Sequence, residues 1–100
     1  MEKTKLKKDL VFNYKIDELE KLIREYIQYP LVENEKTDTL WQKIKNKLDI
    51  ICNEYNLNYE NLINFDNPYI CGFKLLFESE LIMIIIADLC EKSVQSIFYE

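Results

Sequence analysis

The feature that most constrains the fold of this 100-residue chain is an uninterrupted apolar run near its carboxyl end. The run extends over seven residues, Leu81 to Ala87, and is bounded by Glu80 and Asp88. A helix that crosses a membrane needs about 20 apolar residues, so this run is too short for a bilayer. We therefore expect it to lie in the core of a folded domain.

Two structures of the last third of the chain are compatible with this run. As a helix from about Ser79 to Phe98, it would be apolar all round in its middle and central to a bundle. As a hairpin over residues 73–86, it would supply two strands joined near Ser79. The connecting residues offer none of the Asn-Gly or Gly-Gly pairs of tight hairpins, and polar residues recur with helical spacing from Asp88 onward. The sequence therefore favours the helix, and the hairpin is the alternative.

The amino-terminal half contains two helix patterns. In residues 16–27, apolar side chains recur at steps of three and four along one face, and Pro30 ends the pattern. In residues 40–55, the same spacing continues for about four turns, which makes this the clearest element of the chain. Its amino-terminal cap is expected among the residues that can accept hydrogen bonds from free helix amides, namely Thr37, Asp38 and Thr39.

Asparagines dominate the connection at residues 56–67, where they favour turns and helix caps over helix interiors. A short helix around Tyr59 to Asn64 and a further helix from Pro68 fit this region, with Gly72 weakening the second. Together these elements predict an all-α fold, a compact bundle of about four helices. The alternative is an α+β fold with a C-terminal hairpin from residues 73–86.

The length of the chain bounds its organisation. Compact domains usually have ~100 to 150 residues, so we expect residues 1–100 to form a single domain. Within it, residues 1–8 carry four lysines against Glu2, and we expect them to be a flexible basic arm. The alternative for this arm is a tail that touches a polyanion.

Charge narrows the class of partner. Thirteen Lys and Arg against eighteen Asp and Glu give a net charge of −5, divided as +1 over residues 1–50 and −6 over residues 51–100. Phosphate contacts require a cationic surface, so we expect no direct nucleic-acid binding and a basic protein as the natural partner. The one folded basic cluster is more typical of solvated helix surface than of a nucleic-acid site. Its members are Lys36, Lys43, Lys45 and Lys47.

The residues of common catalytic sites are largely missing. Histidine is absent, which removes the usual proton shuttle at neutral pH and the commonest nitrogen ligand of zinc. The carboxylate pairs Glu78 with Glu80 and Asp88 with Glu91 could perform acid–base work, but they favour a solvated, ion-paired surface. We therefore expect no enzymatic activity, no catalytic residues and no cofactor.

Three cysteines, Cys52, Cys71 and Cys90, lie nineteen residues apart. A three-thiolate metal site would use this regularity, but the spacing matches no zinc signature, so no metal site is predicted. An odd number of cysteines without a CxxC pair is typical of reduced thiols in a cytoplasmic protein. The amino terminus also lacks the continuous apolar stretch of a secretory signal, so we expect a cytoplasmic protein without a membrane partner.

Acids and tyrosines are interspersed in the middle of the chain, where Lys and Arg are absent. Tyrosine supplies rigid contact area with a polar tip, and carboxylates pair with lysine or arginine, so this composition suits capture of a cationic protein groove. The alternative is a set of half-buried tyrosines on an acidic surface that binds nothing. The residues predicted to bind a partner are Glu54, Tyr55, Tyr59, Glu60, Asp66 and Tyr69.

These features favour a small acidic protein-binding inhibitor. Such a protein would neutralise a basic, nuclease-like toxin by occluding its active site, as an immunity protein or antitoxin does. The chain is similar to bacterial immunity proteins and phage-borne inhibitors in size and charge only. The alternative is a structural or regulatory helical module that self-associates or joins a larger complex through an apolar face. Apolar area left uncovered on so small a domain would favour a homodimer.

Overall fold

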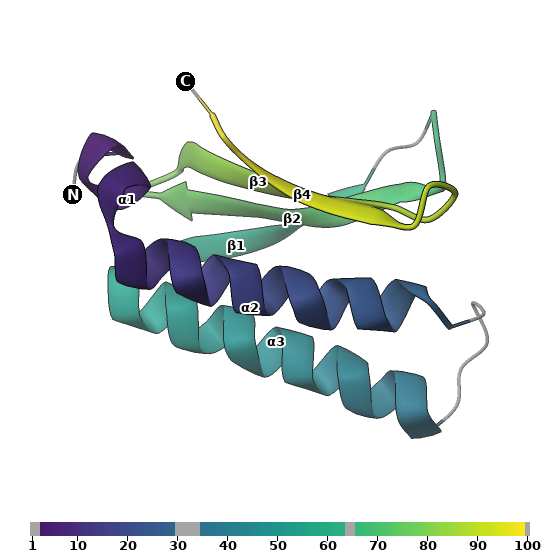
Figure 1. Cartoon of the computed structure of the whole chain (residues 1–100). Helices are drawn as coiled ribbons and strands as arrows, with labels where there is room; N and C mark the ends of the chain where they lie inside the picture. The colour runs from purple at the N-terminus through teal and green to yellow at the C-terminus, as the bar shows by residue number, and fades with distance from the viewer. Residues whose placement is uncertain (1–2, 30–34, 64–65, 100) are drawn as a thin grey trace.

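The computed structural model of the chain describes residues 3–29, 35–63 and 66–99. The described helices and strands, in chain order, are α1 (Lys3–Lys8), α2 (Leu10–Ile27), α3 (Glu35–Tyr55), β1 (Asn58–Ile63), β2 (Ile70–Phe77), β3 (Glu80–Asp88) and β4 (Ser93–Phe98). The strands form one antiparallel sheet in the order β1-β2-β3-β4. α2 and α3 lie side by side against one face of this sheet, and α1 turns away from the axis of α2 at one end of the molecule (Figure 1).

The architecture is α+β, so the prediction of an all-α helical bundle is wrong. The alternative α+β fold with a C-terminal hairpin fits, because β2 and β3 pair as that hairpin. The helix predicted over Ser79–Phe98 is replaced by β3 and β4, and the helix predicted from Pro68 is replaced by β2. The short helix predicted around Tyr59 is replaced by β1.

The side chains of β3 explain why the apolar run forms a strand. Met83, Ile85 and Ala87 are buried toward the helices, while Ile84 and Ile86 point to the other side of the sheet. The run contains four isoleucines, whose branched side chains lose rotamer freedom in a helix and pack well on a pleated sheet. A central strand that is apolar on both faces lacks the alternation that identifies a strand with one solvated face.

The β2–β3 hairpin closes through a two-residue turn at Glu78 and Ser79, flanked by the pair Phe77 and Glu80. Both turn residues have positive φ, 49° for Glu78 and 70° for Ser79. This is the backbone of a type I′ turn, whose twist matches that of the flanking strands. Left-handed backbone costs a residue with a side chain roughly 1–2 kcal/mol. The strand pairing therefore imposes a turn that its residues do not favour.

Replacing the turn by the residues that its backbone favours, Glu78→Asn with Ser79→Gly, should stabilise the protein by about 1–2 kcal/mol, because both tolerate positive φ. Urea unfolding followed by circular dichroism measures the difference. Ser93→Gly, at the first residue of β4, is the control and should instead destabilise by roughly 0.5–1 kcal/mol. A double variant no more stable than the native chain would show that the turn is not strained.

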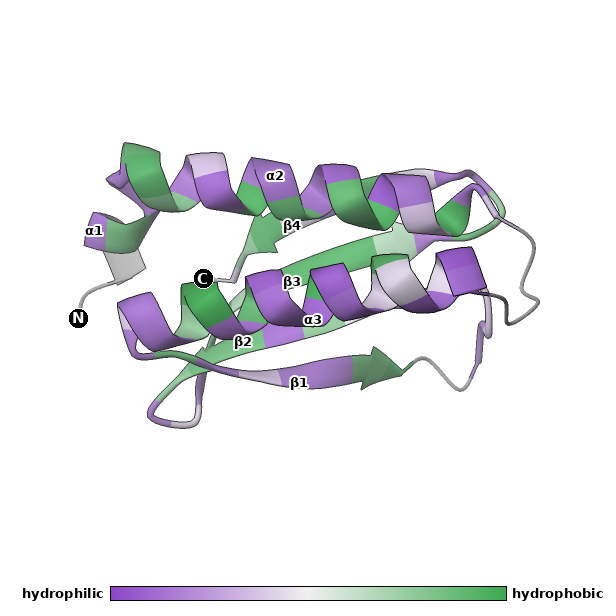
Figure 2. Cartoon of the chain, turned by 90° about the horizontal axis from the view of Figure 1, so that it is seen from below, coloured by the Kyte–Doolittle hydropathy of each residue, from purple (hydrophilic) through white to green (hydrophobic). Residues whose placement is uncertain are grey.

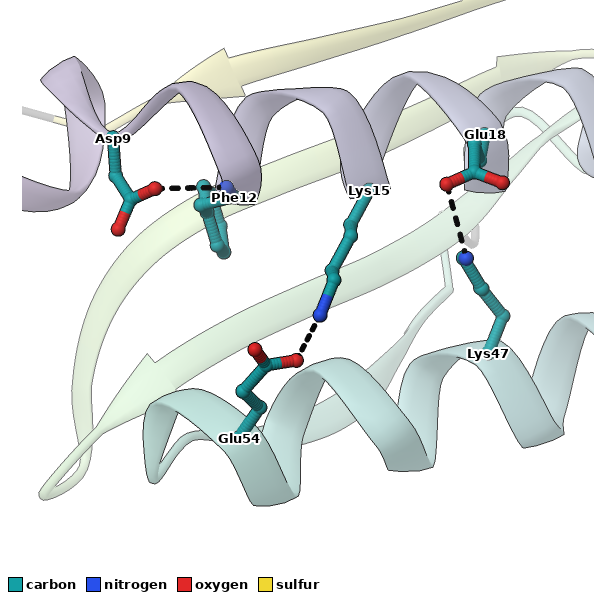
Figure 3. Close-up of polar contacts among 6 residues, drawn as sticks. All are labelled: Asp9, Phe12, Lys15, Glu18, Lys47 and Glu54. Carbon is teal, nitrogen blue, oxygen red and sulfur yellow. Dashed lines mark hydrogen bonds and ion pairs between the residues drawn. The ribbon is translucent and has the colours of Figure 1, made fainter.

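α2 begins at a cap that the sequence analysis did not identify. The Phe12 amide donates a hydrogen bond to Asp9 Oδ1 at 3.0 Å (Figure 3). The helix therefore starts at Leu10 instead of Ile16. The apolar face predicted within residues 16–27 is confirmed, since Ile16, Leu19, Ile23 and Ile27 are all buried.

α3 begins at Glu35, before the predicted cap residues, so Thr37 lies inside the first turn and is buried. Its carboxyl end is closed by Asn56, which has a φ of 55°. The Leu57 amide donates to the Cys52 carbonyl oxygen at 2.8 Å, the long hydrogen bond of a Schellman cap. Asn56 thus ends the helix and turns the chain directly into β1.

The interior between the helices and the sheet provides the stability of the fold. In Figure 2, apolar segments of the sheet lie behind α2 and α3, along which hydrophilic and hydrophobic residues alternate. Ion pairs join the two helices on their outward side, Lys15 with Glu54 and Lys47 with Glu18, and solvent screening makes them minor contributors to stability (Figure 3). The largest fully buried side chains are Phe12, Leu19, Ile44, Leu48, Ile51, Leu75, Met83 and Ile85.

The first residues of the chain, predicted to be a flexible arm, include α1. Leu6 of this helix is 3% exposed and belongs to the core. The Asp9 amide donates to the Leu6 carbonyl oxygen at 3.1 Å, and Asn13 Nδ2 donates to the Lys7 carbonyl oxygen at 2.9 Å, so α1 is joined to α2. Met1 and Glu2 lie outside the described residues. The flexibility of the first eight residues stays a prediction.

Gly72, the only glycine of the chain, lies in β2 where the backbone of β3 approaches most closely. Its φ of +151° is one that residues with a side chain rarely adopt. A Cβ atom at this position would lie 1.8 Å from the Ile85 carbonyl oxygen, a backbone atom that the sheet holds in place. Glycine is therefore required here by both conformation and space.

Gly72→Ala should destabilise the protein by about 3 kcal/mol or more, because the new methyl group displaces the β3 backbone. Urea unfolding, or loss of the folded circular-dichroism spectrum, measures the effect. Gln95→Ala on β4 is the control, with an expected change of about 0.5 kcal/mol or less. A loss below about 1 kcal/mol for Gly72→Ala would contradict the close approach of β2 and β3.

Candidate protein-binding surface

One face of the sheet is covered by α2 and α3, and no described element covers the other face, which we call the open face (Figure 1). The strand register identifies its side chains. Residues next to the buried Leu75, Met83 and Ile85 along each strand point away from the helices. The apolar residues of the open face are Leu62, Ile70, Leu76, Leu81, Ile84, Ile86 and Ile97.

The open face is more apolar than the solvated side of an antiparallel sheet should be. Such a sheet usually alternates apolar residues toward the core with polar residues toward water. Here Leu76 pairs with Leu81, and Ile84 pairs with Ile97, so apolar side chains adjoin one another across three strands. Ile97 is 47% exposed. The other six apolar residues of the face are half-buried. A contiguous, partly exposed apolar patch of this kind is typical of an interaction surface.

Carboxylates lie at both ends of the sheet and on β1, whereas β4 carries none. Glu60 lies on the open face of β1, directly opposite Lys74 of β2. Glu78 and Glu80 are exposed at one end of the sheet, in the β2–β3 turn, and Glu91 is exposed at the β3–β4 turn. The open face is therefore apolar at its centre and acidic at its two ends and on β1.

The two layers of the molecule differ in charge. The sheet segments, residues 58–63 and 66–99, carry two lysines against six acids, a net charge of −4. The helix segments, residues 3–29 and 35–55, carry eleven Lys and Arg against nine acids, a net charge of +2. Lys92 Nζ donates to the Ile27 carbonyl oxygen at 2.7 Å and so points toward the helix layer. Of the two lysines in the described sheet segments, only Lys74 therefore lies on the open face.

Three of the six predicted binding residues lie where α3 meets β1. Glu54 pairs with Lys15 of α2. The Tyr55 ring packs edge-on against Phe12, with ring centroids 5.0 Å apart. Tyr59 lies on the helix side of β1 and packs edge-on against Phe73. Burial is the main cause that raises the pKa of both tyrosines. These two rings contribute to packing.

The other three predicted residues do not adjoin the first group. Glu60 lies on the open face, on the opposite side of β1 from its neighbour Tyr59. Asp66 and Tyr69 are exposed beyond the far end of β1, a strand of six residues that spans roughly 17–20 Å. The six residues are therefore divided between two faces and two ends of β1. Their role in binding stays a prediction.

The apolar residues of the open face were not predicted as a site from the sequence. The signal was present in β3, where Ile84 and Ile86 follow the period of two that a strand requires. It was hidden because the helix-facing positions of β3 are equally apolar. Once the strands are known, the same residues identify the surface.

Two of the three cysteines, Cys52 and Cys71, have the properties of structural thiols, whereas Cys90 is exposed. Burial raises the pKa of Cys52 to about 11, and it also raises the pKa of Cys71. At neutral pH both thiols are therefore protonated, a state that is neither nucleophilic nor metal-binding. Within the described ranges, no group of three or more potential metal ligands is found.

The predicted basic cluster lies on α3 and its lysines make separate contacts. Lys47 pairs with Glu18 at 3.3 Å, and Lys36 lies 4.7 Å above the Tyr29 ring. A hollow of about 450 Å³ beside α3 is lined by lysines and glutamates together. This mixture of charges favours the interpretation as solvated helix surface.

Asp88 and Glu91, one of the two carboxylate pairs considered for catalysis, lie at the β3–β4 turn. Asp88 Oδ1 accepts hydrogen bonds from the Cys90 amide at 2.9 Å and from the Glu91 amide at 3.1 Å. Asp88 therefore stabilises the turn. The absence of enzymatic activity stays a prediction.

Comparison of the chain with protein-family models, with curated proteins and with solved structures finds no match. None of the helices in the described ranges has the length and the apolar character that a membrane crossing requires.

Glu20 is the one buried acid among the described residues, at 9% exposure on the side of α2 that faces the core. Burial raises its pKa above the ordinary value, and the Arg24 guanidinium, 3.7 Å away, lowers it only in part. Since the folded-state pKa is the higher one, folding favours the protonated carboxyl. The stability that this group contributes is fully present below the unfolded-state pKa and is lost as pH rises through the folded-state pKa.

Glu20→Gln should therefore be more stable than the native chain at pH 7, and this advantage should shrink as pH falls, disappearing below about pH 4. Urea unfolding of both proteins from acid to neutral pH measures the difference. Glu25→Gln, at an exposed position of the same helix, is the matched control. An advantage that grows toward acid pH would contradict the assigned cause.

Proposed function

We propose that this chain is a small inhibitor that binds a basic protein on the open face of its sheet. The partner would be a nuclease-like toxin, and the chain would neutralise it as an immunity protein or antitoxin does. The observation that carries this proposal is the combination of an uncovered apolar band on the sheet with carboxylates at its two ends and on β1.

The size of the open face is compatible with a protein partner. Four strands about 4.8 Å apart and some 20 Å long give a face on the order of 400 Å². A standard protein interface buries about 800 Å² on each side, so the open face would supply the apolar centre of such a contact. The acidic turns and the edge of β1 would supply its polar rim.

Charge favours a basic partner over a second copy of the chain. Two open faces brought together would place two sheet layers of net charge −4 against each other. A partner with lysines and arginines around an apolar surface would instead be attracted at long range and would pair with the rim. This attraction accelerates the encounter, while the buried apolar contacts slow dissociation.

Inhibition follows from the same contacts. A protein that binds nucleic acid needs a cationic groove for phosphates, and carboxylates at the rim of the open face would occupy part of that groove. Glu60, which belongs to the residues predicted from the sequence, lies on the open face and would take part. Catalysis by the chain itself is not required.

The exposed isoleucines of the two layers offer a matched test. Ile97 on the open face is 47% exposed, and Ile50 on the outward side of α3 is 56% exposed. Gene fragments of the encoding organism, displayed on phage, are selected on the purified chain. Selected fragments should be cationic, and Ile97→Lys should weaken their binding about tenfold or more, because it removes an apolar contact and adds repulsion. Ile50→Lys should leave binding unchanged.

Two results would contradict the proposal. One is that the selected fragments are acidic or neutral. The other is that they bind Ile97→Lys as tightly as Ile50→Lys. If the pure chain is a dimer in sedimentation and only Ile97→Lys makes it a monomer, the open face is covered by a second copy instead.

A further inference from the structure

A second exposed apolar surface lies where α1 meets α2. We call this the amino-terminal corner and define it by Lys5, Lys8, Leu10, Val11 and Tyr14. Leu10 is 83% exposed, Val11 56% and Tyr14 64%. Within the described helices, no other stretch of five consecutive residues contains three large apolar side chains that are each more than half exposed.

These side chains lie on the side of α2 that the core does not use. Phe12 and Ile16 are buried toward the sheet. At 100° per residue, Leu10 and Tyr14 lie roughly opposite Phe12 on the helix. From the next turn on, the outward positions are charged and exposed, first at Asp17 and then at Lys21. The apolar character is therefore confined to the start of the helix.

The same corner is strongly cationic. Residues 3–8 contain four lysines and no acid, and Lys5, Lys7 and Lys8 are exposed. Buried Leu6 holds the helix that carries them against the core. The next acid along the chain, Asp9, is engaged as the cap of α2. Along the chain, this positive charge comes directly before the exposed aliphatic and aromatic side chains at the start of α2.

We propose that the amino-terminal corner binds the surface of an anionic lipid membrane. The lysines contact lipid phosphates, and Leu10, Val11 and Tyr14 enter the headgroup region, where a tyrosine ring is well accommodated. Such binding uses two weak contributions together, charge and apolar insertion. Duplex nucleic acid would satisfy the lysines but would leave Leu10 and Val11 in water, so a membrane fits the surface better.

This contact needs no membrane-spanning helix. The sequence-based expectation of no membrane partner rested on the absence of a spanning segment and of a secretory signal, neither of which peripheral binding requires. Leu10 and Tyr14 lie on the side of α2 opposite to the buried Phe12. The open face lies on the far side of the sheet from α2 (Figure 1), so a chain bound in this way keeps its open face directed away from the lipid. The proposal is independent of the protein partner proposed above.

Co-sedimentation with vesicles tests the proposal. The full chain is mixed with phosphatidylcholine vesicles with and without phosphatidylserine, and binding is expected only to the anionic ones. Each lysine near such a surface contributes about a fivefold gain in affinity, so Lys5→Gln with Lys8→Gln should weaken binding about 25-fold. Leu10→Ser with Tyr14→Ser should also weaken binding, by about tenfold or more, since it removes the inserted side chains.

Matched controls use exposed residues of α3. Lys43→Gln with Lys45→Gln makes the same change of charge, and Ile50→Ser makes a comparable apolar-to-polar change. Both should bind as the native chain does, and circular dichroism verifies that every variant is folded. Equal loss in the control and corner variants would overturn the proposal, as would equal binding to both kinds of vesicle. Tight binding to duplex DNA that Leu10→Ser with Tyr14→Ser leaves unchanged would overturn it in favour of a polyanion site.

Discussion

The open face arises from the relative widths of the two layers. Packed helices lie 8–10 Å apart and neighbouring strands about 4.8 Å apart, so two helices cover about four strands. α2 and α3 therefore cover one face of the sheet, and no described element remains for a third layer. β3 is apolar on both sides, so its second side stays exposed to water unless another molecule covers it. The proposed partner surface exists because β3 is apolar on both faces while the helices cover only one of them.

The helical half of the fold could be predicted because its apolar residues repeat with the period of a helix. Residues 16–27 and 40–55 each bury one stripe, so the pattern alone identified both elements. The strands could not be predicted in the same way. β3 is apolar on both faces and therefore carries no period, and the turn at Glu78 and Ser79 has positive φ without glycine or asparagine. The structure of residues 58–98 depends on pairing between strands, and this pairing cannot be recognised from local sequence patterns.

The acidic character of the candidate surface could be predicted from charge, whereas its residues could not. The sequence already separates a basic first half from an acidic second half, and the fold turns this separation into two layers. The six predicted binding residues were grouped because they are close in the chain, but closeness in the chain does not place side chains on the same face. In a strand, successive side chains point to opposite faces, so Tyr59 faces the helices while Glu60 faces outward. The apolar members of the open face come from all four strands and become adjacent only through pairing.

The junction between α3 and β1 has a consequence for how such chains can diverge. Asn56 and Leu57 are its only residues, and Leu57 is buried at 5% exposure, so the end of the helix fixes where the strand begins. One inserted residue at this point would exchange the two faces of β1, moving Tyr59 outward and Glu60 beneath α3. Descendants of this gene can therefore lengthen the outer turns of the sheet freely, while this junction must keep its length.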